Sequence, residues 1–124
     1  MKVLTLKKRK DFLRAAKGVK SVTPSLILQA ALSLSSPHKP IYENVCYLGY
    51  TATKKLGKAH IRNFTKRRLR AAAAQIFPAH AASGCDYVLI GRFCTTNIDF
   101  ETLKENMKQA LNEVNEQLFP NKEK

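Results

Sequence analysis

The segment 54–70, KKLGKAHIRNFTKRRLR, contains eight Lys or Arg residues and no Asp or Glu. Guanidinium and ammonium groups at this density repel one another unless solvent or a polyanion screens them. Arginine binds phosphate oxygens through two parallel hydrogen bonds, and lysine adds a point charge. The chemistry that these residue types favour is therefore the binding of a nucleic acid.

The spacing within the segment places the charges on one side of a helix. At 100° per residue, five polar residues fall within about 140° of one another. We call them the basic arc: Arg62, Asn63, Lys66, Arg67 and Arg70. The opposite side carries Ile61, Thr65, Leu69, Ala72 and Ile76. A merely solvated helix usually interleaves acids for i,i+4 pairing, so the arc is interpreted as a binding surface.

Three lysines lie in the turn between the predicted strand and this helix, on either side of Gly57: Lys54, Lys55 and Lys58. The free N–H groups at a helix start add positive potential at such a position. Asn63 can hydrogen-bond a base edge or a 2′-hydroxyl. A DNA recognition helix could use the same residue types, but no helix-turn-helix pair or zinc-finger spacing accompanies them.

Residues suited to independent catalysis are sparse. A nuclease acting alone needs clustered carboxylates for Mg²⁺, or a His acid and base, and residues 1–70 contain only Asp11 and Glu43 as acids. His38, His60 and His80 lie far apart and lack a Cys or carboxylate at ligand spacing. We expect no catalytic residue, metal site or cofactor on this protein alone; His60 is a candidate for a pH-dependent RNA contact.

The charge is distributed unevenly along the 124 residues. Residues 1–70 hold 17 Lys or Arg against two acids, a net of +15, and residues 71–124 hold five against seven, a net of −2. Such asymmetry points to a polyanionic partner, nucleic acid first and an acidic membrane surface second. No lipidation motif and no hydrophobic face beside the basic one support the membrane.

The cysteines favour a reducing compartment. Cys46, Cys85 and Cys94 form no CxxC pair, and their number is odd; Cys46 and Cys85 lie in or beside apolar segments, where a free thiol acts as a small hydrophobe. With no signal peptide and no apolar run of about 18 residues, a cytoplasmic protein is expected.

One domain, residues 1–124, must position these side chains. The pattern predicts a helix at 7–17, strands at 25–34 and 45–53, a helix from about 59 to 77 that Pro78 stops, a strand at 86–92 and a last helix capped by Asp99. A further short strand around 20–22 and a frayed tail at 119–124 are also expected. This mixture predicts an α+β fold with one sheet and helices packed on it.

Two side-chain patterns within these elements predict the core. In the strand 45–53, alternation places Val45, Tyr47, Gly49, Thr51 and Thr53 on one face, and Cys46, Leu48, Tyr50 and Ala52 on the other. In the last helix, an apolar stripe at helical spacing is interpreted as core: Phe100, Leu103, Met107, Ala110, Leu111, Val114 and Leu118.

The central block carries a resemblance to a known family. Residues 57–67, GKAHIRNFTKR, preceded by Lys54-Lys55, closely resemble the signature of the bacterial ribonuclease P protein component. The similarity extends to Asp11-Phe12, to Leu48-Gly49-Tyr50 and to the strand DYVLI at 86–90. Two residues depart from the signature: Phe64 replaces the third residue of Arg-Asn-Arg, and His60 replaces the usual Val. Ala16 also stands where the family often has an aromatic residue.

The resemblance implies a fold of order αβββαβα with about four strands, three helices and a left-handed crossover, like the second domain of ribosomal protein S5. It implies a protein subunit that binds the catalytic RNA of ribonuclease P and the 5′ leader of precursor tRNA, which the enzyme removes, with the catalytic centre and its Mg²⁺ in the RNA. Carried over by position, the RNA-subunit contacts are Lys54, Lys55, Lys58, Arg62, Asn63, Lys66, Arg67 and Arg70. The resemblance also implies that Phe12 and Tyr50 line a cleft for the precursor leader, between the first helix and the sheet. Arg9 and Arg14 are expected at the same site, because basic residues around an aromatic ring bind single strands by phosphate pairing and stacking.

Two alternatives remain at this point. A ribosomal protein, or another protein that binds structured RNA without processing it, would present the same basic helix, and a DNA-binding regulator is a third class. The sequence also leaves open whether Phe12 lines a cleft or belongs to the core, since Leu13 and Ala16 flank it.

Overall fold

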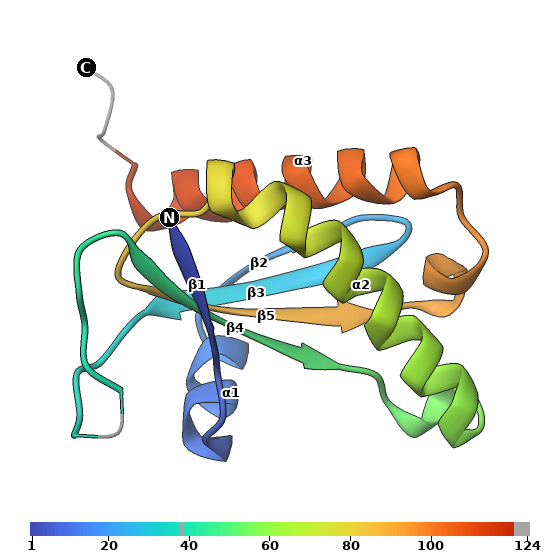
Figure 1. The fold of residues 1–124 in the computed structure, drawn as a ribbon, viewed down its shortest axis with the longest axis horizontal. Helices are drawn as coiled ribbons and strands as arrows, with labels where there is room; N and C mark the ends of the chain where they lie inside the picture. Colours follow the sequence, from blue (N-terminus) through green and yellow to red (C-terminus); the bar gives the residue numbers. More distant parts are fainter. Residues whose placement is uncertain (38, 121–124) are drawn as a thin grey trace.

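The computed structural model describes residues 1–37 and 39–120. Five strands form one mixed sheet in the order β1-β4-β5-β3-β2 (Figure 1). The strands are β1 (Lys2–Thr5), β2 (Val19–Val22), β3 (Leu26–Leu32), β4 (Val45–Thr51) and β5 (Cys85–Gly91). β4 pairs in parallel with β1 and with β5, whereas β3 pairs antiparallel with β5 and β2.

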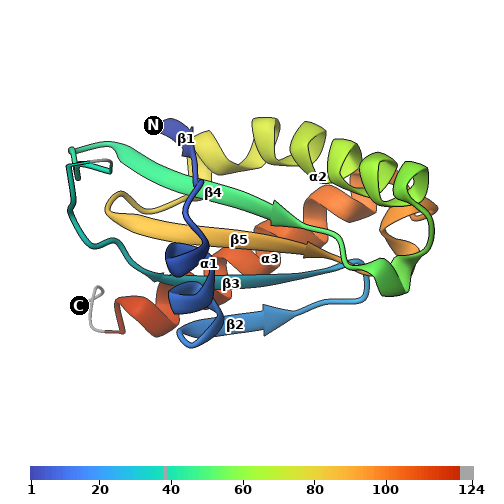
Figure 2. The ribbon, with the colours of Figure 1, turned by 90° about the horizontal axis from the view of Figure 1, so that it is seen from below.

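The helices divide between the two faces of this sheet. They are α1 (Arg9–Ala16), α2 (Ala59–His80) and α3 (Phe100–Leu118), with short 3-10 turns η1 (Lys54–Leu56) and η2 (Phe93–Thr96). α2 and α3 cover one face of the sheet, and α1 crosses the other. The view from below shows that α1 covers only part of that second face (Figure 2). The main core therefore lies between the sheet and the helix pair α2–α3.

Alternation along β4 serves both faces, as its sequence predicts. Cys46 and Leu48 belong to the main core under α2 and α3, while Val45 and Tyr47 belong to a smaller core under α1. The predicted apolar stripe of α3 is core: its five central members are fully buried, and Phe100 and Leu118 at its ends are half-buried. On α2, four members of the predicted apolar side are buried: Thr65, Leu69, Ala72 and Ile76.

The number of strands differs from the expectation of about four. The short strand expected around 20–22 is present as β2, but the sequence pattern does not predict β1. Its four residues, KVLT, are too few for a periodic pattern. β1 forms because β4 has a free edge. Its structure is set by parallel pairing with that edge, from Lys2 opposite Val45 to Thr5 opposite Leu48.

Helix α2 is three residues longer than predicted. Pro78 lies inside its last turn, and the helix ends at His80, with Ala81 donating its backbone N–H to Phe77 O at 2.9 Å. Proline removes one hydrogen bond from a helix, but in the last turn that loss falls next to exposed residues. The cap of α3 is confirmed, since Asp99 accepts the backbone N–H of Thr102 at 3.2 Å.

Two expectations fall partly outside the description. His38 is not among the described residues, and neither are residues 121–124 of the expected frayed tail. Phe119, at the start of that tail, is half-buried and packs against the main core.

Candidate nucleic-acid interface

The turn between β4 and α2 sets the entry to the basic helix. Gly57 adopts φ 131°, a conformation open to glycine, and a Cβ there would lie 2.9 Å from Ile61 Cδ1. Lys58 is the N-cap of α2 and gives no side-chain hydrogen bond to the first turn. The first N–H groups of α2 are therefore available to solvent or to an anion, beside the exposed ammonium groups of Lys54, Lys55 and Lys58.

The basic arc lies on the solvent side of α2. Asn63, Arg67 and Arg70 are exposed, and Arg62 and Lys66 are half-buried. Among the described residues, no ion pair joins the arc to a carboxylate, and Arg62 makes only a long hydrogen bond from Nε to Gly57 O, 3.3 Å. Five neighbouring polar groups without acidic partners are suited to binding phosphates.

Arg70 packs on an aromatic ring. Its guanidinium carbon lies 4.9 Å from the ring centroid of Tyr50 on β4, within the range of a cation–π interaction. Burial raises the pKa of Tyr50 to about 12, although Arg70 acts to lower it. Tyr50 is thus a neutral platform that orients Arg70 at neutral pH.

Arg68 lies outside the arc. Its Nη1 donates to Thr95 O at 2.8 Å, and its guanidinium lies 5.9 Å from the ring centroid of Phe100. This arginine joins α2 to η2 and to the start of α3. It stabilises the scaffold, whereas its neighbour Arg67 points to solvent.

Phe64 occupies the flank of the arc that faces η2. At 100° per residue it stands between Arg67 and Arg68, next to the Arg67 side of the arc. The side chain is 42% exposed, and Arg67 lies 5.6 Å from its ring centroid. It belongs to neither core cluster of the described residues.

On the other face of the sheet, Phe12 lies on the centre of β4. A Cβ added to Gly49 would be 2.4 Å from Phe12 Cζ, so the ring covers the glycine directly. Phe12 is half-buried and packs on the smaller core. Arg9 is exposed and precedes it by three residues on the same side of α1. Phe12 therefore contributes to the smaller core without being fully buried, and its role at a leader cleft stays a prediction.

Arg14 lies on a different side of α1, in a cluster of charges. It pairs with Asp86 at 2.7 Å and with Asp11 at 2.9 Å, and it also donates to Leu32 O. Lys39 contacts both carboxylates, and Ser33 donates to Asp86. Asp86 is fully buried, and Asp11 and Lys39 are 5% exposed each. This charge cluster ties α1, β5 and the 33–39 segment together.

The four residues expected at the precursor leader are therefore not brought to one surface. Phe12 and Arg9 share the α1 face, Arg14 is held in the charge cluster, and Tyr50 faces α2. The reason is the alternation of β4, because Gly49 and Tyr50 are consecutive and point to opposite faces of the sheet. The eight residues expected at the RNA subunit, by contrast, all come from η1 and α2 and its N-cap.

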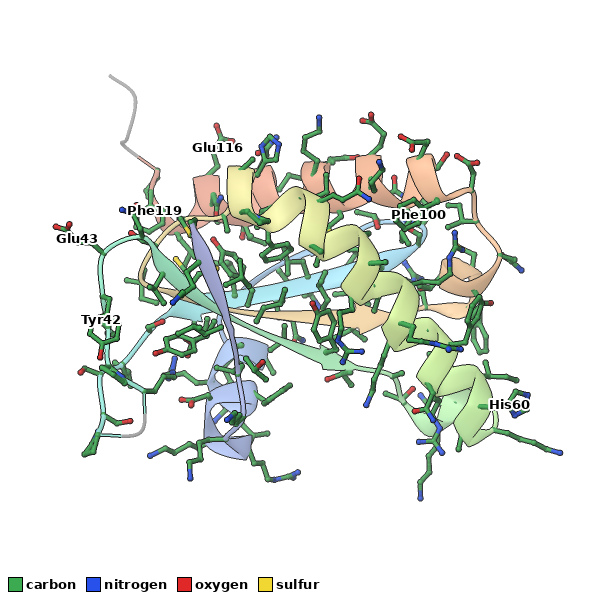
Figure 3. All side chains as sticks on the ribbon, in the orientation of Figure 1. Tyr42, Glu43, His60, Phe100, Glu116 and Phe119 are labelled. Atoms are coloured by element: carbon green, nitrogen blue, oxygen red, sulfur yellow. The ribbon has the colours of Figure 1, made fainter. Side chains whose placement is uncertain are left out.

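A pocket that the sequence did not reveal adjoins the start of α1. Its volume is about 620 Å³, and it lies between β1, α1 and the 39–42 segment. Lys7, Lys8 and the exposed Tyr42 line it, with Tyr47 donating its hydroxyl to Pro40 O at 2.6 Å. No sequence spacing links these residues, because the pattern does not predict β1 itself. Tyr42 lies on the loop at the end of the molecule opposite His60 (Figure 3).

The described histidines and acids were compared with the groupings that metal ions require. Within residues 1–37 and 39–120, no group of three His, Cys, Asp or Glu side chains could hold a metal ion. His60 and His80 are both exposed, near the two ends of α2. In the same described ranges, no helix combines the length and apolar character needed to cross a membrane.

Comparisons with known proteins identify relatives over most of the chain. The family model Ribonuclease P matches residues 1–115. The ribonuclease P protein component of Paramagnetospirillum magneticum is 44% identical over 110 residues, which are 88% of this chain and 80% of the relative. That of Ruegeria pomeroyi is 36% identical over 113 residues, 90% of this chain and 86% of the relative. The solved structure of the ribonuclease P protein from Thermotoga maritima superposes with a TM-score of 0.70 at 25% identity, covering 89% of this chain and 96% of the other.

Proposed function

The chain belongs to the ribonuclease P protein family, and from this premise we propose that it binds the ribonuclease P RNA through the basic arc and assists removal of the 5′ leader from precursor tRNA. The observation that carries the proposal is the basic arc itself. Its members protrude from one side of α2, and none of them pairs with an acid among the described residues.

The RNA subunit would meet α2 and the turn before it. Arg62, Lys66, Arg67 and Arg70 would pair with phosphates, and Asn63 would hydrogen-bond a base edge or a 2′-hydroxyl. Lys54, Lys55 and Lys58 extend this surface to the free N–H groups at the helix start. Tyr50 serves this interface indirectly, by holding Arg70 in place.

The precursor leader would lie on the α1 face. Aromatic and basic side chains together bind single strands, since bases stack on the rings while phosphates pair with the cations. Phe12 and Arg9 offer that combination over the glycine floor of β4. Arg14 would contribute through the charge cluster, by fixing the position of α1. Ala16 leaves this end of the surface without the aromatic residue common in relatives.

We assign the catalytic centre and its Mg²⁺ to the RNA subunit. The carboxylates of Asp11 and Asp86 are already neutralised by Arg14 and Lys39. The protein would screen phosphate repulsion, stabilise the folded RNA and favour leader-bearing precursor over mature tRNA. A single domain with three free cysteines fits this role in the bacterial cytoplasm.

We also propose the left-handed connection that the family resemblance implies for β4–α2–β5, and with it a likeness to the second domain of ribosomal protein S5. Its support is the combination of parallel β4 and β5 pairing with the position of α2 on the face opposite α1. Most parallel connections are right-handed, so this feature would mark the fold.

Reconstitution tests the proposal. The cognate ribonuclease P RNA, transcribed in vitro, is incubated with precursor tRNA at low Mg²⁺ with and without the protein, and leader release is followed. We expect the protein to stimulate cleavage and to lower the Mg²⁺ requirement. Tight RNA binding without any stimulation would instead favour a structural RNA-binding protein.

A further inference from the structure

Resting on the proposed function, we propose that two exposed rings on elements that pack together, Phe64 on α2 and Phe93 on η2, each stack on an unpaired base of the ribonuclease P RNA beside the basic arc; we call these two rings the stacking surface. At this flank the chain would use aromatic stacking where relatives use an arginine. The proposal thus requires that the region of the RNA next to the basic arc contains unpaired, unstacked bases.

The exposure of the two rings is the first argument. Phe93 is 73% exposed, the highest fraction for a large apolar side chain among the described residues, and Phe64 is 42% exposed. Exposed rings lose the stabilisation that burial would give them. A ring beside a strongly basic surface is suited to a partner with both phosphates and flat apolar faces.

The second argument is the rigidity of the turn that carries Phe93. η2 packs against α2, and Arg68 Nη1 donates to Thr95 O at 2.8 Å across that contact. From the other side, Arg92 Nη1 donates to Thr23 O at 2.7 Å. Thr95 is fully buried and bonds to Ser25 O. Because η2 is held on both sides, ordering it on binding costs little conformational entropy.

The third argument is continuity with the basic arc. Arg67, a member of the arc, lies over the Phe64 ring at 5.6 Å. A base that stacks on Phe64 would thus place its phosphate near a guanidinium already ordered by the same ring. Arg68 is engaged with Thr95 and Phe100 and is not free to replace this contact.

A tryptophan reporter tests the proposal, because the chain contains no Trp. In Phe64→Trp and Phe93→Trp, the indole is the sole fluorophore of its kind, and stacking on a base quenches its emission. We expect quenching of both when the cognate RNA is added. The matched control is Asn112→Trp, an exposed position on α3, where the emission should not change.

Affinity measurements separate stacking from charge and from packing. Phe64→Ala should weaken RNA-subunit binding roughly tenfold, within the range for one stacked base, with the slope of log affinity against log salt unchanged. Phe64→Leu should fail to restore the affinity, because it keeps apolar volume but cannot stack. Phe64→Arg should steepen the slope by about one counterion.

These outcomes are distinguishable from failure of the proposed function. If wild-type protein neither binds the RNA nor stimulates cleavage, the proposed function itself fails. If it does both, yet the emission of Phe64→Trp is not quenched and Phe64→Ala binds as wild type, the stacking surface is refuted and the function stands. Restoration of full affinity by Phe64→Leu would likewise refute stacking and assign the ring to packing.

Discussion

At the centre of β4, Gly49 is the floor on which the Phe12 ring rests. The expected Cβ of any other residue would be 2.4 Å from Phe12 Cζ and 2.7 Å from Cε2, far inside van der Waals contact. Glycine in a strand interior often marks such a close approach. The position of the Phe12 ring depends on the absence of a side chain at Gly49, and so does the shape of the surface that α1 forms on this face of the sheet.

Gly49→Ala should therefore displace the Phe12 ring and reduce the preference for leader-bearing precursor over mature tRNA. Binding of the RNA subunit should be retained, since the basic arc lies on another face. The measurement is the ratio of affinities of the reconstituted enzyme for the two tRNA forms. Phe12→Ala should give the same loss, and in Gly49→Ala/Phe12→Ala the two effects should not add, because the ring is already absent.

Arg62→Ala tests the basic arc. We expect weaker RNA-subunit binding and a salt dependence reduced by about one counterion per lost phosphate contact. Titrations at several salt concentrations measure both quantities. Lys108→Ala on α3 is the matched control, and its slope should equal that of wild type. An unchanged slope in Arg62→Ala and in Arg67→Ala would mean that the arc faces solvent in the complex.

The three thiols should differ in reactivity. Burial raises the pKa of Cys46 to about 12 and that of Cys85 to about 11, so both stay protonated in the folded protein at pH 9. Cys94 is half-exposed. Iodoacetamide at pH 9 should alkylate Cys94 alone in the folded protein, and Cys46 and Cys85 should react only after denaturant is added. Mass spectrometry identifies the modified residues. Rapid modification of Cys46 in the folded protein would contradict this prediction.

At the scale of the elements, the charge cluster connects parts of the chain that are distant in sequence. Asp11 comes from α1, Asp86 from β5 and Lys39 from the loop before β4. A buried pair of this kind is strongly destabilising when one partner is removed, because a charge is left unpaired. The cluster therefore fixes α1 on the sheet and the loop against α1.

Lys39→Met should lower the free energy of unfolding by about 3 to 5 kcal/mol, because two buried carboxylates would share the single guanidinium of Arg14 and one negative charge would be left uncompensated. Urea denaturation followed by circular dichroism measures it. Lys7→Met, an exposed lysine of the same half, should change stability by less than about 0.5 kcal/mol. If Asp86→Asn/Lys39→Met is less destabilised than Lys39→Met, the unpaired charge is the cause.

Elements with long periodic patterns could be predicted from the sequence, and those made by tertiary pairing could not. The stripe of α3 and the two faces of β4 are correct because burial of one side dictates the repeat. β1 could not be found, since four residues acquire their structure from the edge of β4. The position of the basic arc on one side of α2 could be predicted because a single helix carries it, and its binding to RNA stays a prediction. The arrangement of the four residues expected at the precursor leader could not be predicted, because they come from α1 and β4 and the sheet decides which face each of them lies on.

In the whole molecule, the uneven distribution of charge along the sequence becomes an uneven distribution of charge between the two long helices. The basic arc is on α2, while α3 presents exposed acids such as Glu105 and Glu116 to solvent. Glu116 is labelled on α3 in Figure 3. We expect α3 to face away from the RNA. Glu105→Lys/Glu116→Lys, which raises the net charge by about four, should leave the salt slope of RNA binding unchanged, as measured in the same titrations. A steeper slope would place α3 near phosphates.

The place of β5 between β4 and β3 has a consequence for how the protein is made. Translation produces 17 of the 22 Lys and Arg residues before the first residue of β5. Until β5 emerges from the ribosome, β3 and β4 lack the strand that joins them, and contacts this distant in sequence form late. During that interval the nascent chain carries most of the protein's positive charge without its completed sheet. We therefore expect a product truncated before Cys85 to keep the charge that binds RNA but to lack the sheet that gives the basic arc its fixed position.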